Sequence, residues 1–136
     1  MSKYSSVNPA ALSKTEKVLY WALCIFTSIA FFTAGLAKFA GVPSTVLVFE
    51  QIGMGQWFRI LTALIEIGGA FALLVPVSAG VGGLLLATTM LFATLAHLFV
   101  IDGSPVPAIV LFAMSATIGW LHRNHFVTLF IRLSRI

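Results

Sequence analysis

Hydrophobic residues along this chain gather into four long runs, separated by short polar or turn-forming segments. The runs cover residues 18–37, 58–75, 81–101 and 106–121. An α-helix rises about 1.5 Å per residue, so roughly 20 apolar residues cross the hydrocarbon core of a bilayer. The pattern therefore predicts four transmembrane helices, the fourth shorter than the others.

The connections between the later runs are tight. Residues 77–80 follow a proline, and residues 102–105 have the sequence DGSP, which is typical of a turn. Short links of this kind make successive helices antiparallel neighbours. We predict an all-α integral membrane protein, in which residues 18–122 form a four-transmembrane-helix bundle.

The segment between the first two runs, residues 38–57, is too apolar for a simple loop. Pro43 can begin a helix, and Gly53 can end it. We expect a short interfacial helix there, with Glu50 and Gln51 as its polar members.

The two ends of the chain differ from the runs. Residues 1–17 are polar, and Ser13 with Glu16 has the spacing of a capping box, which predicts a helix start near Lys14. In residues 123–136 apolar side chains are interleaved with arginines, as in an amphipathic interfacial tail.

Basic residues set the expected orientation. With four spans the two termini share one side of the membrane, and that side collects Lys3, Lys14, Lys17, Arg123, Arg132 and Arg135. The opposite side has only Lys38 and Arg59. The positive-inside rule then predicts a multi-pass protein of the cell inner (plasma) membrane with N- and C-termini cytoplasmic.

Composition agrees with a membrane protein. Hydrophobic residues make up 60% of the 136 residues and charged residues 9%, whereas soluble domains carry about a quarter charged residues. The pI near 9.7 comes from bases at the ends of the runs rather than from a basic patch, so we expect no nucleic acid partner. The single Cys24 excludes an internal disulfide or a C-x-x-C redox motif.

Glu66 is the candidate functional residue that most needs a partner, because it lies in the middle of the second run. A carboxylate at the centre of a bilayer costs roughly 2.5 to 3.5 kcal/mol. Lys38, at the outer end of the first run, and His97, about one turn from the outer end of the third, are the nearest candidates for compensation. The lining of this region would include Glu50 and Gln51.

Small residues in the runs are predicted packing positions that let helix backbones approach. The ones near the candidate site are Gly35, Gly68 and Gly69. The polar group itself has two interpretations: a structural clasp that holds the helices in register, or a ligand-binding or proton-handling site.

The sequence contains few signals for haem binding, metal binding or catalysis. His97 is expected near one membrane face and His122 with His125 near the other, so they cannot share one haem iron. No cluster has the spacing of metal ligands, and no catalytic motif is present, so the catalytic residues are unknown. His122, Arg123 and His125 are most simply contacts to lipid headgroups.

Four stretches carry a family resemblance: residues 32–39 (FTAGLAKF), 49–53 (FEQIG), 64–76 (LIEIGGAFALLVP) and 93–97 (ATLAH). In this order and spacing they resemble the DoxX-like family. The resemblance implies a four-helix membrane protein, chiefly bacterial, among relatives that include a thiosulfate:quinone oxidoreductase subunit and maturation or chaperone factors. The matching positions are Gly35, Lys38, Glu66, Gly68, Gly69 and His97.

Three functions are compatible with these observations. The leading hypothesis is an accessory or assembly subunit whose outer-half polar cavity, formed by Lys38, Glu66 and His97, binds a quinone-like or lipid ligand or a protein partner. The alternative is a quinone-linked membrane oxidoreductase subunit with quinone as its cofactor. A small proton-coupled transporter is less favoured, because the transporters it resembles place their glutamate in the first span. A homodimer is permitted.

Overall fold

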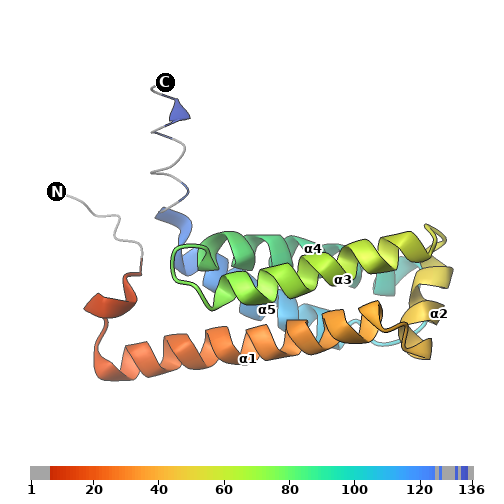
Figure 1. Cartoon of the computed structure of the whole chain (residues 1–136), viewed down its shortest axis with the longest axis horizontal. Helices are drawn as coiled ribbons and strands as arrows, with labels where there is room; N and C mark the ends of the chain where they lie inside the picture. The colour runs from red at the N-terminus through yellow and green to blue at the C-terminus, as the bar shows by residue number, and fades with distance from the viewer. Residues whose placement is uncertain (1–6, 125, 127–130, 132, 135–136) are drawn as a thin grey trace.

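A computed structural model describes residues 7–124, 126, 131, 133 and 134. Within them the chain forms five α-helices and no strand, preceded by the short 3-10 helix η1 (Pro9–Ala11). The α-helices are α1 (Lys14–Phe39), α2 (Pro43–Ile52), α3 (Gln56–Leu73), α4 (Ala79–Phe99) and α5 (Val106–Leu121) (Figure 1). The predicted lead at residues 1–6 and most of the predicted tail after residue 124 lie outside the described residues.

Length and composition support the predicted membrane fold. Helices α1, α3 and α4 are long and apolar enough to cross a membrane. Helix α5 is also apolar but has 16 residues, or about 24 Å. The all-helical membrane bundle is therefore confirmed, and the fourth run is the short helix that the sequence predicted.

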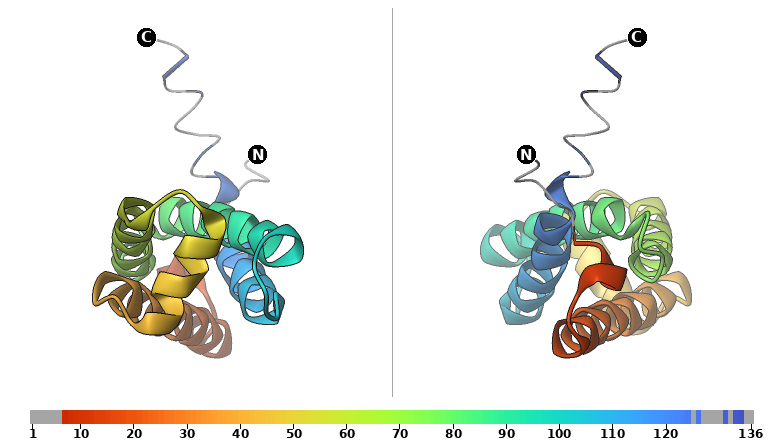
Figure 2. Two further views of the ribbon diagram at one scale, coloured as in Figure 1. Left: turned by 90° about the vertical axis from the view of Figure 1, so that its right-hand side faces the viewer. Right: turned by 90° about the vertical axis from the view of Figure 1, so that its left-hand side faces the viewer.

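The four long helices lie side by side, and end-on views show α2 crossing one end of them (Figure 2). Helix α1 packs along α3, α3 along α4, and α4 along α5, whereas α1 and α5 touch much less. We call the end crossed by α2 the α2 end, and the end where α1 begins the η1 end. The bundle thus has three well-packed interfaces and one thin seam, between α1 and α5.

Local chemistry explains the helix boundaries. Ser13 and Glu16 form the predicted capping box, so α1 begins at Lys14. Pro43 occupies the first turn of α2, and Gly53 ends it with a φ of 77°, a left-handed conformation that favours glycine. Gly55, with a φ of 89°, precedes α3. The expected short helix between the first two spans is therefore present.

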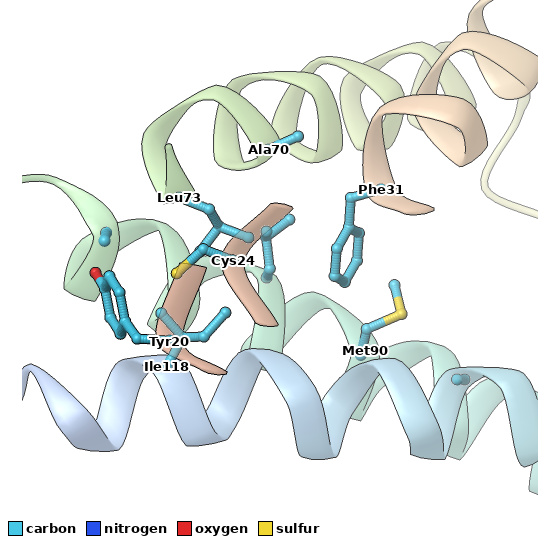
Figure 3. Packing of buried hydrophobic residues seen from close by; sticks show 10 residues of the cluster. Tyr20, Cys24, Phe31, Ala70, Leu73, Met90 and Ile118 are labelled. Atoms are coloured by element: carbon cyan, nitrogen blue, oxygen red, sulfur yellow. The ribbon is translucent and has the colours of Figure 1, made fainter. Parts of the chain in front are cut away.

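The interior of the bundle is built from apolar side chains of all four long helices. Tyr20, Cys24 and Phe31 lie along the inner face of α1, opposite Leu73 and Met90 (Figure 3). Many large apolar side chains point outward instead, including Phe26, Leu64, Leu84, Phe92 and Ile109. An apolar exterior of this extent suits a protein whose solvent is lipid.

Glycines set the closest helix approaches, and two of them give a matched test. A Cβ added at Gly83 would lie 2.7 Å from the backbone nitrogen of Gly119, whereas one added at Gly68 meets nothing within 4 Å. We expect Gly83→Ala to force α4 away from α5 and to destabilise the protein by about 1–3 kcal/mol. Gly68→Ala should be neutral or slightly stabilising. Thermal unfolding in detergent measures both, and equal melting temperatures would contradict the described α4–α5 interface.

Candidate functional site

A direct ion pair joins the first and third α-helices. Lys38, in the last turn of α1, places its Nζ 2.7 Å from Oε2 and 3.0 Å from Oε1 of Glu66 on α3. The Glu66 side chain is 1% exposed, and the Lys38 side chain is 19% exposed. The expected neutralisation of the buried acid by Lys38 is present, and the pair can be reached only from the lysine side.

Gly35 brings the two backbones close enough for this contact. It lies one turn before Lys38, and a Cβ at this position would be 2.7 Å from Cγ1 of Ile67. Gly69 likewise fits against α4, because a Cβ there would be 2.6 Å from Leu86. Gly35 and Gly69 therefore lie at close helix contacts, whereas a Cβ at Gly68 would meet nothing within 4 Å.

A second set of polar contacts surrounds the end of α1. Arg59 donates from Nη1 to the backbone carbonyl of Lys38, and from Nε to Oε1 of Gln56 at 2.6 Å. Gln56 in turn donates from Nε2 to the carbonyl of Val46 at 3.3 Å. The guanidinium packs over Gly41, whose φ is 70°. These contacts tie α1, α2 and α3 together next to the ion pair.

Sequence reasoning missed this role of Arg59, which was assigned only to membrane topology. A helix leaves its last carbonyls without partners and carries partial negative charge there. A cation at the end of α1 satisfies one such carbonyl. The available signal was the spacing of Arg59 and Glu66, seven residues apart and hence on one face of α3.

His97 does not join this cluster. In the described part of the chain no hydrogen bond links it to Lys38 or Glu66, and its buried Nδ1 has no partner. The ring lies toward the turn between α4 and α5, where a Cβ on Gly103 would be 3.9 Å from Nδ1. Helix α4 packs against α3 and α5 and has far less contact with α1, which carries Lys38. A ligand-binding role for His97 stays a prediction.

Glu50 and Gln51 are exposed on α2. Among the described hydrogen bonds none involves either side chain, so their place in the site stays a prediction as well. The buried residue of α2 is Phe49, whose ring meets Phe58 of α3 edge-on at 5.8 Å between centroids. Helix α2 is thus attached by an aromatic contact, with its polar side chains outward.

His122 corrects another expectation. Its side chain is 2% exposed, and its Nε2 lies 2.9 Å from the hydroxyl of Tyr20, so it is not a headgroup contact. Arg123 is exposed and lies over the Trp120 ring, with 4.6 Å from Cζ to the centroid. His125 lies outside the described residues. As for metals, no group of three or more potential ligands occurs among the residues searched in the structure.

Fold and site together define a small helical membrane protein with a buried acid–base pair between its first two spans. The chain belongs to the DoxX-like family, which it matches over residues 22–119. The matched region contains Lys38, Glu66 and His97.

One relative is a Bacillus subtilis (strain 168) protein named "Putative oxidoreductase CatD", 29% identical over 82 residues. The aligned region covers 60% of this chain and 61% of that relative, so the chain spans about three-fifths of the relative's length. No solved structure matches this chain.

The ion pair predicts a non-additive mutational cycle. Removing one partner of a buried pair leaves an unmatched charge and costs roughly 3–5 kcal/mol, whereas removing both costs less. We expect Lys38→Met to be more damaging than Glu66→Gln, because Glu66 is the more deeply buried partner. The double variant should recover part of the loss. Melting temperatures in detergent measure the cycle, with Lys17→Met as the exposed control on the same helix; additive shifts would contradict the pairing.

Arg59 gives a separate prediction about the α2 end. Arg59→Met removes the bonds to Lys38 and Gln56 while keeping an apolar stem. We expect faster proteolysis within residues 40–55, because α1, α2 and α3 lose their polar connection there. Arg123→Met is the matched control, since it also removes a guanidinium bonded to a helix carbonyl. Identical cleavage rates for both variants would show that Arg59 does not hold this end together.

Proposed function

We propose that this protein is an accessory or assembly subunit whose Lys38–Glu66 site binds the oxygen-bearing head of a quinone-like or lipid ligand, or docks a partner helix. The observation that supports this most is the one-sided exposure of the pair. Glu66 is enclosed by the bundle, while part of Lys38 remains accessible.

Hydrogen-bond capacity supports the same proposal. A lysine ammonium has three N–H donors, and the two oxygens of Glu66 occupy two of them. A third donor is left for an oxygen of a bound group. Glu66 keeps the ammonium charged, and Arg59 holds the end of the helix that carries it.

The cost of burying the pair also favours a site over a simple clasp. Burying two charges has a desolvation penalty that their attraction roughly offsets, so an ion pair is an inefficient way to stabilise a bundle. Ionisable groups within a membrane more often mark ligand or proton sites.

A quinone-linked oxidoreductase subunit is the second candidate. It is favoured by the name of the Bacillus subtilis relative and by the chemistry of the pair, since reduction of a bound quinone takes up protons and Glu66 can relay a proton to the carbonyl oxygen. In this case Lys38 would donate to the carbonyl oxygen. His97, Glu50 and Gln51 would contribute only if the ligand reaches them.

Extraction from native membranes in a mild detergent tests both candidates. Mass spectrometry of co-purifying proteins and small molecules would compare the wild type, the Lys38→Met/Glu66→Gln double variant and the Lys17→Met control. We expect one species to be lost from the double variant alone. If that species is a quinone, altered quinone reduction in Glu66→Gln membranes would support the oxidoreductase subunit. The same species in all three samples would contradict the proposal.

We also propose that the protein lies in the plasma membrane with both termini cytoplasmic. Support comes from Lys14, Lys17 and Arg123, since Val7 at the η1 end hydrogen-bonds to Leu121 at the end of α5. These bases therefore lie at one end of the bundle, as the positive-inside rule requires.

A further inference from the structure

A hollow opens at the η1 end, on the thin seam between α1 and α5. Its volume is about 320 Å³. Five aliphatic side chains line it, including Leu19, Leu23 and Leu121, together with two polar residues, Glu16 and Tyr20. Lys38 and Glu66 lie toward the α2 end, so this hollow is separate from the site described above.

Tyr20, one of the two polar residues that line the hollow, is hydrogen-bonded to the buried side chain of His122. The Tyr20 hydroxyl and Nε2 of His122 are 2.9 Å apart, and the two residues are 5% and 2% exposed. Gly80 of α4 makes room for the imidazole, because a Cβ there would lie 2.6 Å from Cβ of His122. The ring of Trp21 meets Tyr20 edge-on at 5.6 Å and limits its movement. The pair is therefore held in place from several elements.

The pair can offer either a donor or an acceptor to a third group. If the phenol donates to Nε2, its oxygen still accepts a hydrogen bond; if Nε2–H donates to the phenol oxygen, the hydroxyl proton is free to donate. Such a pair matches a ligand oxygen of either kind, a hydroxyl or a carbonyl.

Glu16 restricts the charge of the ligand. It accepts a hydrogen bond from the backbone nitrogen of Ser13 at 3.0 Å, which holds its carboxylate at the capping box beside the hollow. A fixed negative charge there disfavours an anionic head. The volume lies at the low end of the range for small-molecule pockets, which are about 300–1,000 Å³, so one head and part of a tail would fill it.

We propose that this hollow binds a neutral amphiphile, whose hydroxyl or carbonyl head contacts Tyr20 and whose aliphatic tail lies along Leu19 and Leu23 in the α1–α5 seam. Neutral lipids and isoprenoid quinones share this chemistry. The site is independent of the proposed role of Lys38 and Glu66.

Three probes distinguish the sources: monoolein, with a hydroxyl head; decylubiquinone, with a carbonyl head; and oleate, with the same chain as monoolein but an anionic head. Titration of the full-length protein in detergent, followed by native mass spectrometry, gives the bound fraction of each. We expect monoolein, decylubiquinone or both to bind at least tenfold more tightly than oleate. Whichever neutral probe binds more tightly identifies the source. Failure of both, or equal binding of oleate, would overturn the proposal.

Variants locate the binding. We expect Tyr20→Phe to weaken binding of the neutral probes about fivefold, because the ligand head loses one hydrogen bond to the Tyr20 hydroxyl. Leu23→Trp, which fills the hollow, should abolish it. Leu36→Trp, at an exposed position near the other end of α1, should leave it unchanged. Unchanged binding in both Tyr20→Phe and Leu23→Trp would overturn the site.

A variant that is expected to gain binding controls for loss of binding through misfolding. Glu16 is exposed and outside the core, so Glu16→Gln keeps the bundle intact while removing the charge. We expect oleate binding to rise severalfold in Glu16→Gln, with little change for monoolein. Oleate binding that stays the same would contradict the assigned role of Glu16 and the placement of the ligand head.

Discussion

The structure depends on neutralising one carboxylate inside an apolar bundle. Glu66 is fully buried, so a cation must reach it from a neighbouring helix. Lys38 does so only because Gly35 brings α1 against α3, and because the lysine lies where α1 ends. Arg59 then anchors that end through the Lys38 carbonyl. The close approach of α1 to α3, and the turn from α1 into α2, are both consistent with this contact.

The two ends of the bundle use polar groups in different ways. At the α2 end, charges are paired, and a second cation binds a backbone carbonyl. At the η1 end, the buried contact joins a phenol and an imidazole beside an apolar hollow. The first arrangement suits an oxygen that carries partial negative charge, and the second suits a neutral head. The two proposed binding sites therefore differ in chemistry as well as in their place along the bundle.

The depth of a residue in the membrane could be inferred from the sequence. The side of its helix on which it lies, and hence the neighbour that its side chain meets, could not. Hydrophobic runs and the capping box placed the helices, and the middle position of Glu66 pointed to Lys38. His97 has a suitable depth, but α4 turns it toward α5. His122 was assigned to the interface because it follows an apolar run, yet Gly80 allows it to be buried. These outcomes depend on which helices are neighbours, and short-range patterns do not contain that information.

The unequal helix lengths affect the surrounding membrane. Helix α1 has 26 residues and α5 has 16, which correspond to about 39 Å and 24 Å. The apolar part of α1, residues 18–37, matches a bilayer core of roughly 30 Å, whereas α5 is shorter than this core, so lipids next to α5 must compress. The free-energy cost of this hydrophobic mismatch falls on the α5 side of the molecule. The protein would therefore favour locally thin membrane on its α5 side and a particular lateral orientation beside any larger neighbour.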